Sequence, residues 1–335
     1  MTGATGFIGS RLVLRSRLVL RCLAEDMAVR ALGRRNNPAE AENASGLEAA
    51  GAEFSEIPVA DRDGLVAAMA GVDVVFHLAA AQHEANVADD YFRSINVDGT
   101  RNVLEAAEQA GVGRVVHGST IGVFGWRSGE VVNEGSPLEP ENIYGITKLE
   151  GEQVVRASAE RVPVVIARIS ETYGPGDRRL LKLFRAAERG LALQIGSGQN
   201  LHHLVYIDDL LDGLLLLGQE ERAVGTTCVL AGREPVSSRA MLEAVSRSLG
   251  RPPRILRLPL SAFMLVALIL ETLLRPLGIQ PPLHRRRLDF FRKSFAFSRD
   301  EASVLGHKPR VGLDDGMRAT ARWYRERGLI SQEGG

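Results

Sequence analysis

Short apolar runs alternate with helical segments through the first half of the chain, and this alternation restricts the possible folds more than any other feature. The candidate strands are residues 27–33, 52–57, 72–78, 114–117 and 162–168. Residues 89–110 and 142–161 lie between them and have the apolar spacing of amphipathic helices. Strands that are apolar throughout are buried on both faces, so the pattern predicts an α/β fold whose doubly wound parallel sheet carries helices on both sides.

The second half of the chain has a different texture. After Tyr173 the regular alternation gives way to loops, helices and isolated short strands, punctuated by glycine and proline. We therefore expect two parts: a sheet domain over residues 1–172 and a smaller lobe over residues 173–330, with elements near 203–231 returning to the sheet. In doubly wound folds, ligands bind at the open edge that such a lobe would cover.

The balance of charges and the cysteine content exclude several classes of protein. The chain has 41 Lys and Arg against 41 Asp and Glu, whereas binding of nucleic-acid phosphates needs a basic surplus. Two cysteines, Cys22 and Cys228, are too few for a disulfide framework and wrongly spaced for zinc. We expect a cytoplasmic protein with a small-molecule partner, no nucleic acid and no metal centre.

A glycine-rich loop stands at the beginning of the sequence. Gly3, Gly6 and Gly9 form a G-x-x-G-x-x-G pattern that opens a predicted helix. Glycines at these positions let a backbone approach a pyrophosphate, and the N-terminus of a helix stabilises its charge. Such a loop alone is a weak signal, but here β/α alternation follows it.

A second polar pattern lies on the helix predicted for residues 142–161. Tyr144 and Lys148 are four residues apart and so lie on one face of that helix. An ammonium beside a phenol favours the phenolate, which would lower the pKa of Tyr144 and allow proton exchange near neutral pH. Ser119 and Thr120 follow the strand at 114–117 and would place hydroxyls in the same ligand crevice.

Together these features resemble the extended short-chain dehydrogenase/reductase family, and in particular its NAD(P)-dependent epimerase/dehydratase branch. The matching segments follow one another along nearly the whole chain: T-G-A-T-G-F-I-G at 2–9, Asp61, H-L-A-A at 77–80, N-V-D-G-T-R-N at 96–102, G-S-T-I-G-V-F-G at 118–125, P-x-x-x-Y-x-x-x-K at 140–148, Y-G-P-G-D at 173–177 and V-Y-I-D-D-L at 205–210. The resemblance implies a Rossmann-type sheet and hydride transfer between a nicotinamide and a secondary alcohol or ketone.

The resemblance also implies roles for individual residues. Tyr144 would be the catalytic acid/base, Lys148 would tune it and hold the nicotinamide ribose, and Thr120 would bind the substrate oxygen. The residues that would bind the cofactor are Gly3, Gly6, Phe7, Ile8, Gly9, Arg34, Asp61, Leu78, Ala79, Ala80, Asn96, Tyr144 and Lys148. Among them Asp61 would contact the adenine and Asn96 would help to order the site. Family members often form homodimers through the helices at 89–110 and 142–161.

Two departures from the family pattern concern the cofactor. Members that prefer NAD have an acidic residue after the second strand, whereas this chain has Gly33 and Arg34, and an arginine can pair with a 2′-phosphate. Both NAD and NADP stay possible, and the sequence favours NADP. In this fold the glycine loop follows a central strand, for which Met1 and Thr2 leave no room. We expect a misplaced start or a truncation, exposed ladder groups and poor cofactor binding or stability.

Other departures concern the substrate. Ile121 and Gly122 stand where sugar 4,6-dehydratases carry acidic residues, which disfavours a dehydratase. His202 and His203 replace an arginine common in nucleotide-sugar members, and Glu171 lies near the place of a common asparagine. Glu171 is either a further acid/base or, as we slightly prefer, an ion-pair partner of Arg168.

The apolar segment at 258–274 is too short and interrupted to span a bilayer. We interpret it as a buried helix in preference to a membrane-surface helix, and its texture resembles the 3β-hydroxysteroid dehydrogenase-like members of the family. The sequence thus predicts an epimerase or oxidoreductase acting on a sugar-nucleotide-like or hydrophobic alcohol. A 3β-hydroxysteroid dehydrogenase-like enzyme and a non-catalytic dinucleotide-binding protein are the alternatives.

Overall fold

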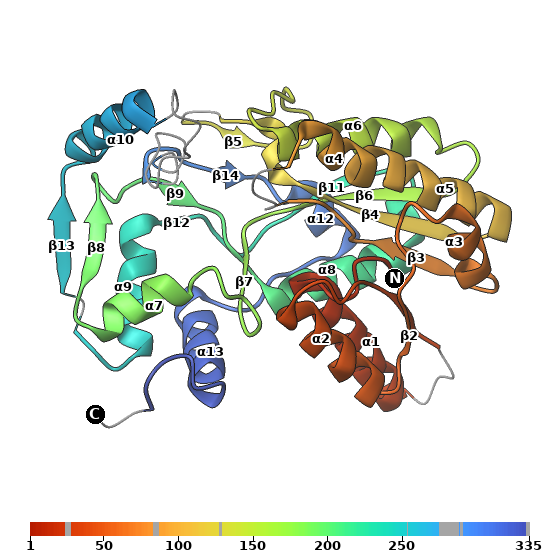
Figure 1. Ribbon diagram of the computed structural model, residues 1–335, viewed down its shortest axis with the longest axis horizontal. Coiled ribbons are helices and arrows are strands. Elements are labelled where there is room, and N and C mark those ends of the chain that lie inside the picture. Colours follow the sequence, from red (N-terminus) through yellow and green to blue (C-terminus); the bar gives the residue numbers. More distant parts are fainter. Residues whose placement is uncertain are drawn as a thin grey trace.

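The computed structural model describes residues 1–23, 28–82, 87–126, 129–252, 254–274, 288 and 291–332. Its centre is a parallel sheet that runs across the right-hand part of Figure 1. The strands are β1 (Arg30–Leu32), β2 (Glu53–Ser55), β3 (Val74–His77), β4 (Arg114–Thr120), β6 (Val164–Ile169) and β11 (Thr227–Leu230). β1 pairs with β2, and β11, β6, β4 and β3 pair in that order, all in parallel. The predicted doubly wound α/β fold is confirmed.

Thr2 joins the two groups of strands. It forms single parallel bridges to Leu32 of β1 and to His77 of β3. The Thr2 amide donates to the Phe76 carbonyl (3.0 Å), and the Leu32 amide donates to the Met1 carbonyl (2.7 Å). No strand is assigned at this position, as expected, but the predicted exposure of ladder groups on both sides is wrong. Two residues are enough to pair the neighbouring backbone groups at this level of the sheet.

Helices cover both faces of the sheet. On one face lie α1 (Phe7–Leu23), α2 (Pro38–Ala49) and α8 (Ile207–Gln219). On the other lie α3 (Arg62–Met69), α4 (Asp89–Arg93), α5 (Gly99–Ala110) and α6 (Ile143–Ala157) (Figure 1). A π-helical turn, Ser94–Asp98, separates α4 from α5 within the helix predicted for 89–110. Separate apolar clusters fill the two layers, which agrees with strands that are buried on both faces.

The remaining elements form a smaller lobe, on the left in Figure 1. There α7 (Leu181–Glu188), α9 (Ser238–Ser248) and α13 (Leu313–Glu326) pack together, and β8 (Ala192–Ile195) pairs with β13 (Ile255–Leu258). Shorter strands pair as β7 (Thr172–Tyr173) with β10 (Val205–Tyr206), β9 (Leu201–His202) with β12 (Val236–Ser237), and β5 (Val131–Val132) with β14 (Ala296–Phe297). α12 (Asp300–Leu305) packs against β11. Although α8 and β11 return to the sheet, the domain boundary at residue 172 stays a prediction.

The apolar segment forms α10 (Leu260–Leu274), at the outer end of the smaller lobe (Figure 1). Ala267 and Glu271 are buried, but five large apolar side chains are between 46% and 61% exposed: Leu265, Val266, Leu268, Ile269 and Leu273. The interpretation as a buried helix is therefore wrong, because the helix packs on the lobe along a narrow stripe. Within the ranges described, none of the helices combines the length and apolar character that crossing a membrane requires.

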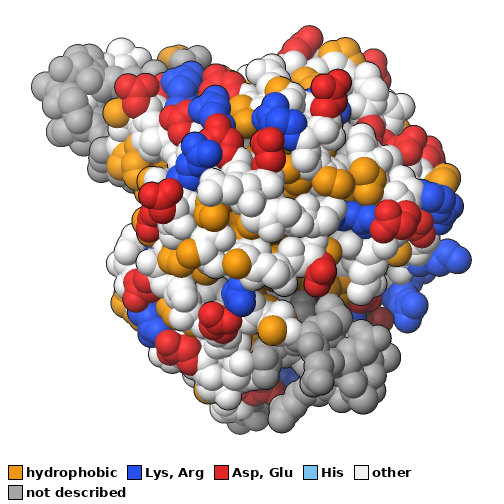
Figure 2. Space-filling model, turned by 90° about the vertical axis from the view of Figure 1, so that its right-hand side faces the viewer, with side chains coloured by type: hydrophobic (Ala, Val, Ile, Leu, Met, Phe, Trp, Pro, Cys, Tyr) orange, Lys and Arg blue, Asp and Glu red, His pale blue; other side chains and the backbone are white. Residues whose placement is uncertain are grey.

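Charges are mixed on the surface and paired in the interior. On the face drawn in Figure 2, basic and acidic side chains are interspersed and form no large field of one sign. In the interior, Arg168 on β6 and Glu152 on α6 are each 1% exposed and form two hydrogen bonds of 3.0 and 2.8 Å. Ser119 also donates to Glu152 (2.6 Å), so this buried ion pair ties α6 to the ends of β4 and β6.

Candidate active site

The glycine loop is packed so closely that only glycine fits at two of its positions. Gly3 has a φ of +70°, and a Cβ there would lie 2.5 Å from the Ala79 nitrogen. A Cβ on Gly9 would lie 2.2 Å from the Gly3 carbonyl oxygen. The loop therefore lies against the end of β3 and leads directly into α1, whose first backbone N–H groups point to the region beside the loop. This arrangement has the geometry that holds a pyrophosphate in dinucleotide-binding folds, and contact of these glycines with a cofactor stays a prediction.

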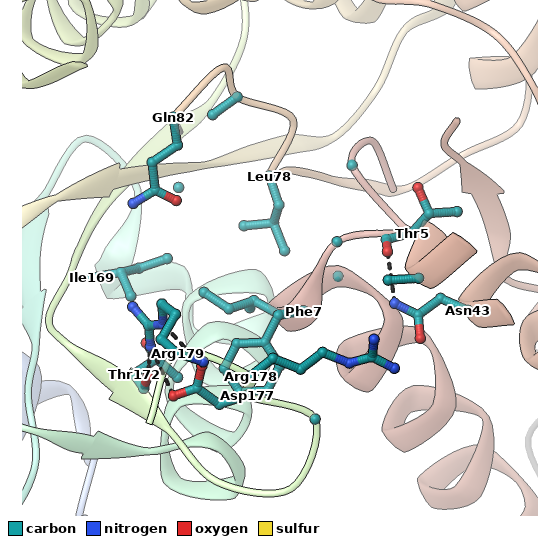
Figure 3. A pocket seen from close by; sticks show the side chains of 18 of the residues that line it. Thr5, Phe7, Asn43, Leu78, Gln82, Ile169, Thr172, Asp177, Arg178 and Arg179 are labelled. Carbon is teal, nitrogen blue, oxygen red and sulfur yellow. Dashed lines mark hydrogen bonds and ion pairs between the residues drawn. The ribbon is translucent and has the colours of Figure 1, made fainter. Parts of the chain in front are cut away.

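A cavity of about 830 Å³ opens at the carboxyl ends of the strands. Its wall is formed by the glycine loop, the residues after β3, the ends of β4 and β6 and the beginning of α6 (Figure 3). Residues 176–179, part of α2 and the end of α13 complete it. Ten of the predicted site residues are among its lining: Gly3, Gly6, Phe7, Ile8, Gly9, Arg34, Leu78, Ala80, Thr120 and Tyr144. Lys148, Asp61, Ala79 and Asn96 are not.

Tyr144 and Thr120 meet in this cavity. Asn142 caps α6 by accepting a hydrogen bond from the Gly145 amide (2.9 Å), which places Tyr144 in the first turn. The Tyr144 hydroxyl and the Thr120 side chain are hydrogen-bonded, and Thr120 Oγ1 also accepts from the Gly122 amide (3.1 Å). Burial raises the pKa of Tyr144 to about 12 although the Thr120 hydrogen bond opposes the shift. The expected lowering of this pKa by Lys148 is wrong for this structure.

Lys148 is directed into the interior of the sheet domain. It is 1% exposed, and its ammonium donates to Nε2 of His117 over 3.3 Å. Burial lowers the pKa of Lys148 to about 8, with Glu152 acting in the opposite direction. The pKa of His117 is held well below its usual value, first by burial and then by this ammonium. Contact between Lys148 and a nicotinamide ribose stays a prediction.

Asn96 orders the site from the interior. It is fully buried in the π-helical turn, where its side chain accepts from the Ala81 amide (2.8 Å) and donates to the Ala81 carbonyl (3.0 Å). The same amide group donates to Thr147 Oγ1 (2.9 Å), which lies on the helix that carries Tyr144. Asn96 thus connects the segment after β3 to α6, and its role in ordering the site around a cofactor stays a prediction.

Two other predicted cofactor residues differ in their placement. Asp61 caps α3 by accepting from the Gly64 amide (3.0 Å) and is exposed outside the cavity, so its contact with adenine stays a prediction. Arg34 follows β1 and lines the cavity. Its guanidinium lies 3.4 Å from the Tyr91 hydroxyl and 4.0 Å from Glu40 Oε1, while its amide donates to Thr5 Oγ1 (3.1 Å).

Several residues of the cavity were missed by the sequence reasoning. Glu42 on α2 pairs with Arg178, which follows the Y-G-P-G-D motif, and with Arg327, which follows α13. Arg327 also lies 5.7 Å from the ring centre of Trp323. Asp177 and Arg179 pair with each other beside Thr172 (Figure 3). Only the position of Asp177 within a motif gave a signal, and the two ion pairs of Glu42 join residues more than a hundred positions apart.

The preferred partner for Glu171 is wrong as well. Arg168 binds Glu152, and Glu171 is among the residues that line the cavity. Its Oε2 lies 3.1 Å from Nδ1 of His202, a side chain that is 1% exposed. The sequence marked both positions as departures from a pattern but gave no indication that they pair, because β6 and β9 meet only in the folded chain.

Comparison with known proteins decides the family. A sequence model of the NAD dependent epimerase/dehydratase family matches residues 1–231. This chain belongs to that family. The family resemblance read from the motifs is thereby confirmed, and the chain is an enzyme of the extended short-chain type.

Members of the epimerase/dehydratase family that resemble this chain differ in their reactions. The UDP-glucose 4-epimerase of Mycolicibacterium smegmatis is 29% identical and covers 98% of this chain and 98% of its own length. The 4-hydroxy-2-methyl-3-oxo-4-farnesyl-3,4-dihydroquinoline-1-oxide ketoreductase of Stigmatella aurantiaca is 31% identical over 95% of this chain and 94% of its own. The dTDP-glucose 4,6-dehydratase DesIV of Streptomyces venezuelae, solved with NAD bound, superimposes with a TM-score of 0.78 at 27% identity, covering 98% of this chain and 97% of its own.

Replacing the buried lysine tests the electrostatics of the site. Lys148→Met removes an ammonium whose pKa is lowered from 10.5 to about 8, so it should raise the free energy of unfolding at pH 7 by about 1–3 kcal/mol. Between pH 8 and 10.5 the unfolded lysine keeps its proton while the folded one has lost it. Stability of the wild type therefore rises with pH in this range, and the advantage of the variant should disappear.

Urea unfolding of both proteins between pH 7 and pH 10.5 measures this difference. Lys182→Met, a substitution at an exposed lysine on α7, is the control and should change stability little at any pH. A Lys148→Met variant that is less stable than the wild type at pH 7 would contradict the account.

Proposed function

We propose that the chain is an NAD(P)-dependent oxidoreductase that transfers hydride at a secondary alcohol or ketone. The observation that carries this proposal is one cavity shared by the glycine loop and by the hydrogen-bonded pair of Thr120 and Tyr144. The close packing of Gly3 against the end of β3 and of Gly9 against Gly3 supports a dinucleotide site, because it brings the N-terminus of α1 to the wall of the cavity.

The residues of the chain divide the chemistry between them. When bound, the nicotinamide supplies or accepts the hydride. Tyr144 keeps its proton at neutral pH, since burial raises its pKa to about 12. It is therefore set to donate that proton to the oxygen of a ketone as an alkoxide forms, while Thr120 binds the same oxygen. This protonation state favours ketone reduction, and oxidation would require loss of the phenolic proton first.

Removal of the phenolic hydroxyl tests this assignment. Tyr144→Phe should lower kcat/KM for NADPH-dependent reduction of an apolar cyclic ketone by about 10²–10⁴-fold, because the proton donor is lost. Its affinity for NADPH should stay within about threefold of the wild type, since the glycine loop is unchanged. The absorbance of NADPH follows turnover, and a fluorescence titration gives the affinity. Full activity in this variant would exclude Tyr144 as the acid.

We further propose a preference for NADP over NAD. The solved relatives described as NAD complexes leave this open, and the support comes from Arg34, which lines the cavity at the end of β1. A guanidinium can bind a 2′-phosphate with charge-assisted hydrogen bonds. In the structure, the Arg34 guanidinium lies 4.0 Å from Glu40, which is in the first turn of α2.

Arg34→Ala should weaken NADPH binding at least tenfold and leave NADH binding within about threefold, because one charged hydrogen-bonding group is worth about 1.5–3 kcal/mol. Arg35→Ala is the matched control: Arg35 pairs with Glu48 and Glu56 and does not line the cavity. Titrations of both nucleotides into each variant give the comparison. Equal weakening for NADPH and NADH would refute a role in 2′-phosphate recognition.

For the substrate, we propose a hydrophobic alcohol or ketone in preference to a sugar nucleotide. The ketoreductase relative carries a farnesyl group in the name of its substrate, whereas other relatives are named for UDP- and dTDP-sugars. Apolar side chains dominate part of the cavity wall, and Phe7, Leu78 and Ile169 point into the same space (Figure 3). An epimerase retains its cofactor through the reaction cycle, whereas a dehydrogenase releases it. Cofactor that stays bound during purification would therefore indicate an epimerase.

We also propose that α10 contacts an anionic membrane surface. Its exposed apolar side chains adjoin a β8–β13 ribbon on which Leu193 and Leu256, direct neighbours in register, are exposed too. Arg251, Arg254 and Arg257 are exposed in and just before β13, and the acidic residue of α10, Glu271, is buried. An apolar face with a basic border is the pattern that binds an interface containing acidic lipids.

Cytoplasmic location and a homodimer through residues 89–110 and 142–161 stay predictions.

The wild type should co-sediment with vesicles that contain phosphatidylserine, and Leu265→Asp with Ile269→Asp should abolish this. Val304→Asp is the control, because Val304 on α12 is 71% exposed and outside this face. A wild type that stays in the supernatant would contradict the proposal.

A further inference from the structure

Glu171 stands at the carboxyl end of β6, where the ligand cavity begins. β6 ends at Ile169, and Ser170 and Glu171 connect it to β7. All three residues line the cavity. The side chain of Glu171 is 31% exposed, so the carboxylate is neither buried in the core nor freely solvated. A charge in this position acts on whatever enters the substrate half of the cavity.

His202 fixes the orientation of this carboxylate. Nε2 of His202 lies 3.2 Å from Nδ2 of Asn200 and 2.8 Å from Oγ of Ser238. Because an amide nitrogen can only donate, Nε2 is the acceptor, and the ring proton is on Nδ1. Nδ1 then donates to Glu171 Oε2 over 3.1 Å. The hydrogen bond from His202 thus fixes the orientation of the Glu171 carboxylate beside the cavity.

Charged side chains of both signs surround the cavity. The arginines of the lining are Arg34, Arg178, Arg179 and Arg327, and its acidic residues are Glu40, Glu42, Glu171 and Asp177. Arg34 faces Glu40, Arg179 binds Asp177, and Glu42 receives both Arg178 and Arg327. The four arginines and the four acidic residues of this described lining balance only when Glu171 is counted, so its carboxylate offsets the surplus positive charge that a second diphosphate would need.

We infer that Glu171, held by His202, is a specificity-determining residue that excludes diphosphate-linked substrates and accepts a hydrogen bond from a hydroxyl of an uncharged one. The inference rests on the proposed function and names the substrate class of the same site. A diphosphate in the substrate half would face a fixed carboxylate at short range, which costs affinity that a partly dehydrated cavity screens only weakly. An ionised carboxylate accepts hydrogen bonds and donates none, so the group that it recognises carries a proton.

The apolar part of the wall agrees with an uncharged substrate. The side chains that contribute to it are Phe7, Ile8, Leu78, Ile121, Ile169 and Trp323. Pockets for small molecules combine such a wall with a few fixed polar groups that set orientation. Here the polar groups are Thr120 and Tyr144 at the reacting oxygen and Glu171 for a second hydroxyl.

The test uses uridine 5′-diphosphate as the probe and isothermal titration as the measurement, with the full chain, both with and without saturating NADP⁺. The isosteric variant Glu171→Gln removes the charge and keeps the shape. It should bind the probe at least tenfold more tightly than the wild type. Glu160→Gln, at an exposed position distant from the cavity lining, is the control and should behave as the wild type. Glu171→Met repeats the comparison should the glutamine variant fail to fold.

A second variant separates charge from orientation. His202→Gln removes the imidazole but keeps the carboxylate, so its affinity for the probe should stay within about threefold of the wild type. Probe binding in this variant as tight as in Glu171→Gln would contradict exclusion by charge. Equal affinity of the wild type and Glu171→Gln, whether strong or undetectable, would overturn the inference.

Failure of the inference and failure of the proposed function are distinguishable. NADPH binding by the wild type is measured separately. If the wild type does not bind NADPH, the oxidoreductase proposal is refuted, whereas the affinities of the wild type and Glu171→Gln for uridine 5′-diphosphate can still be compared. Conversely, normal NADPH binding with unchanged probe affinity in Glu171→Gln would refute the inference alone.

Discussion

The backbone contact between the glycine loop and the first turn of α1 determines how the carboxyl ends of the central strands are arranged around the cavity. A side chain on Gly9 would overlap the Gly3 carbonyl, and one on Gly3 would overlap the backbone at Ala79. This close approach lets Thr2 bridge β1 and β3, directs α1 across the sheet and leaves the N-terminus of α1 open to the cavity. Sheet pairing and helix placement therefore depend on one backbone contact, as does the anion binding that we propose for this loop.

Near that contact the enzyme buries several charged and polar side chains, and their desolvation opposes folding. Lys148 and Glu152 lie on α6, the helix that also carries Tyr144, and contact His117 on β4 and Arg168 on β6. Burial lowers the pKa of both the lysine and the histidine. Such groups reduce stability when their partners are incomplete, and they persist where a catalytic site needs fixed geometry. Asn96 adds a neutral connection between the β3 edge and α6.

The order and type of the sheet elements could be predicted from the sequence because each buried strand is apolar along its length. Residues 72–78 contain β3, and residues 162–168 cover β6 except for Ile169. Ten site residues could likewise be placed because motifs fix them to strand ends. Predictions about charge state and packing failed: the pKa of Tyr144 depends on burial, and the exposure of α10 depends on how little of it the lobe covers. The Glu171–His202 pair joins distant segments and leaves no local pattern.

The central claim is that this cavity binds a nicotinamide dinucleotide through the glycine loop, and a fluorescence titration of the wild-type chain with NADPH tests it most directly. We expect saturable binding at one site with micromolar affinity, because Thr2 restores the pairing on which the loop depends. A chain that is folded by circular dichroism but shows no saturation with millimolar NADPH or NADH would contradict the account.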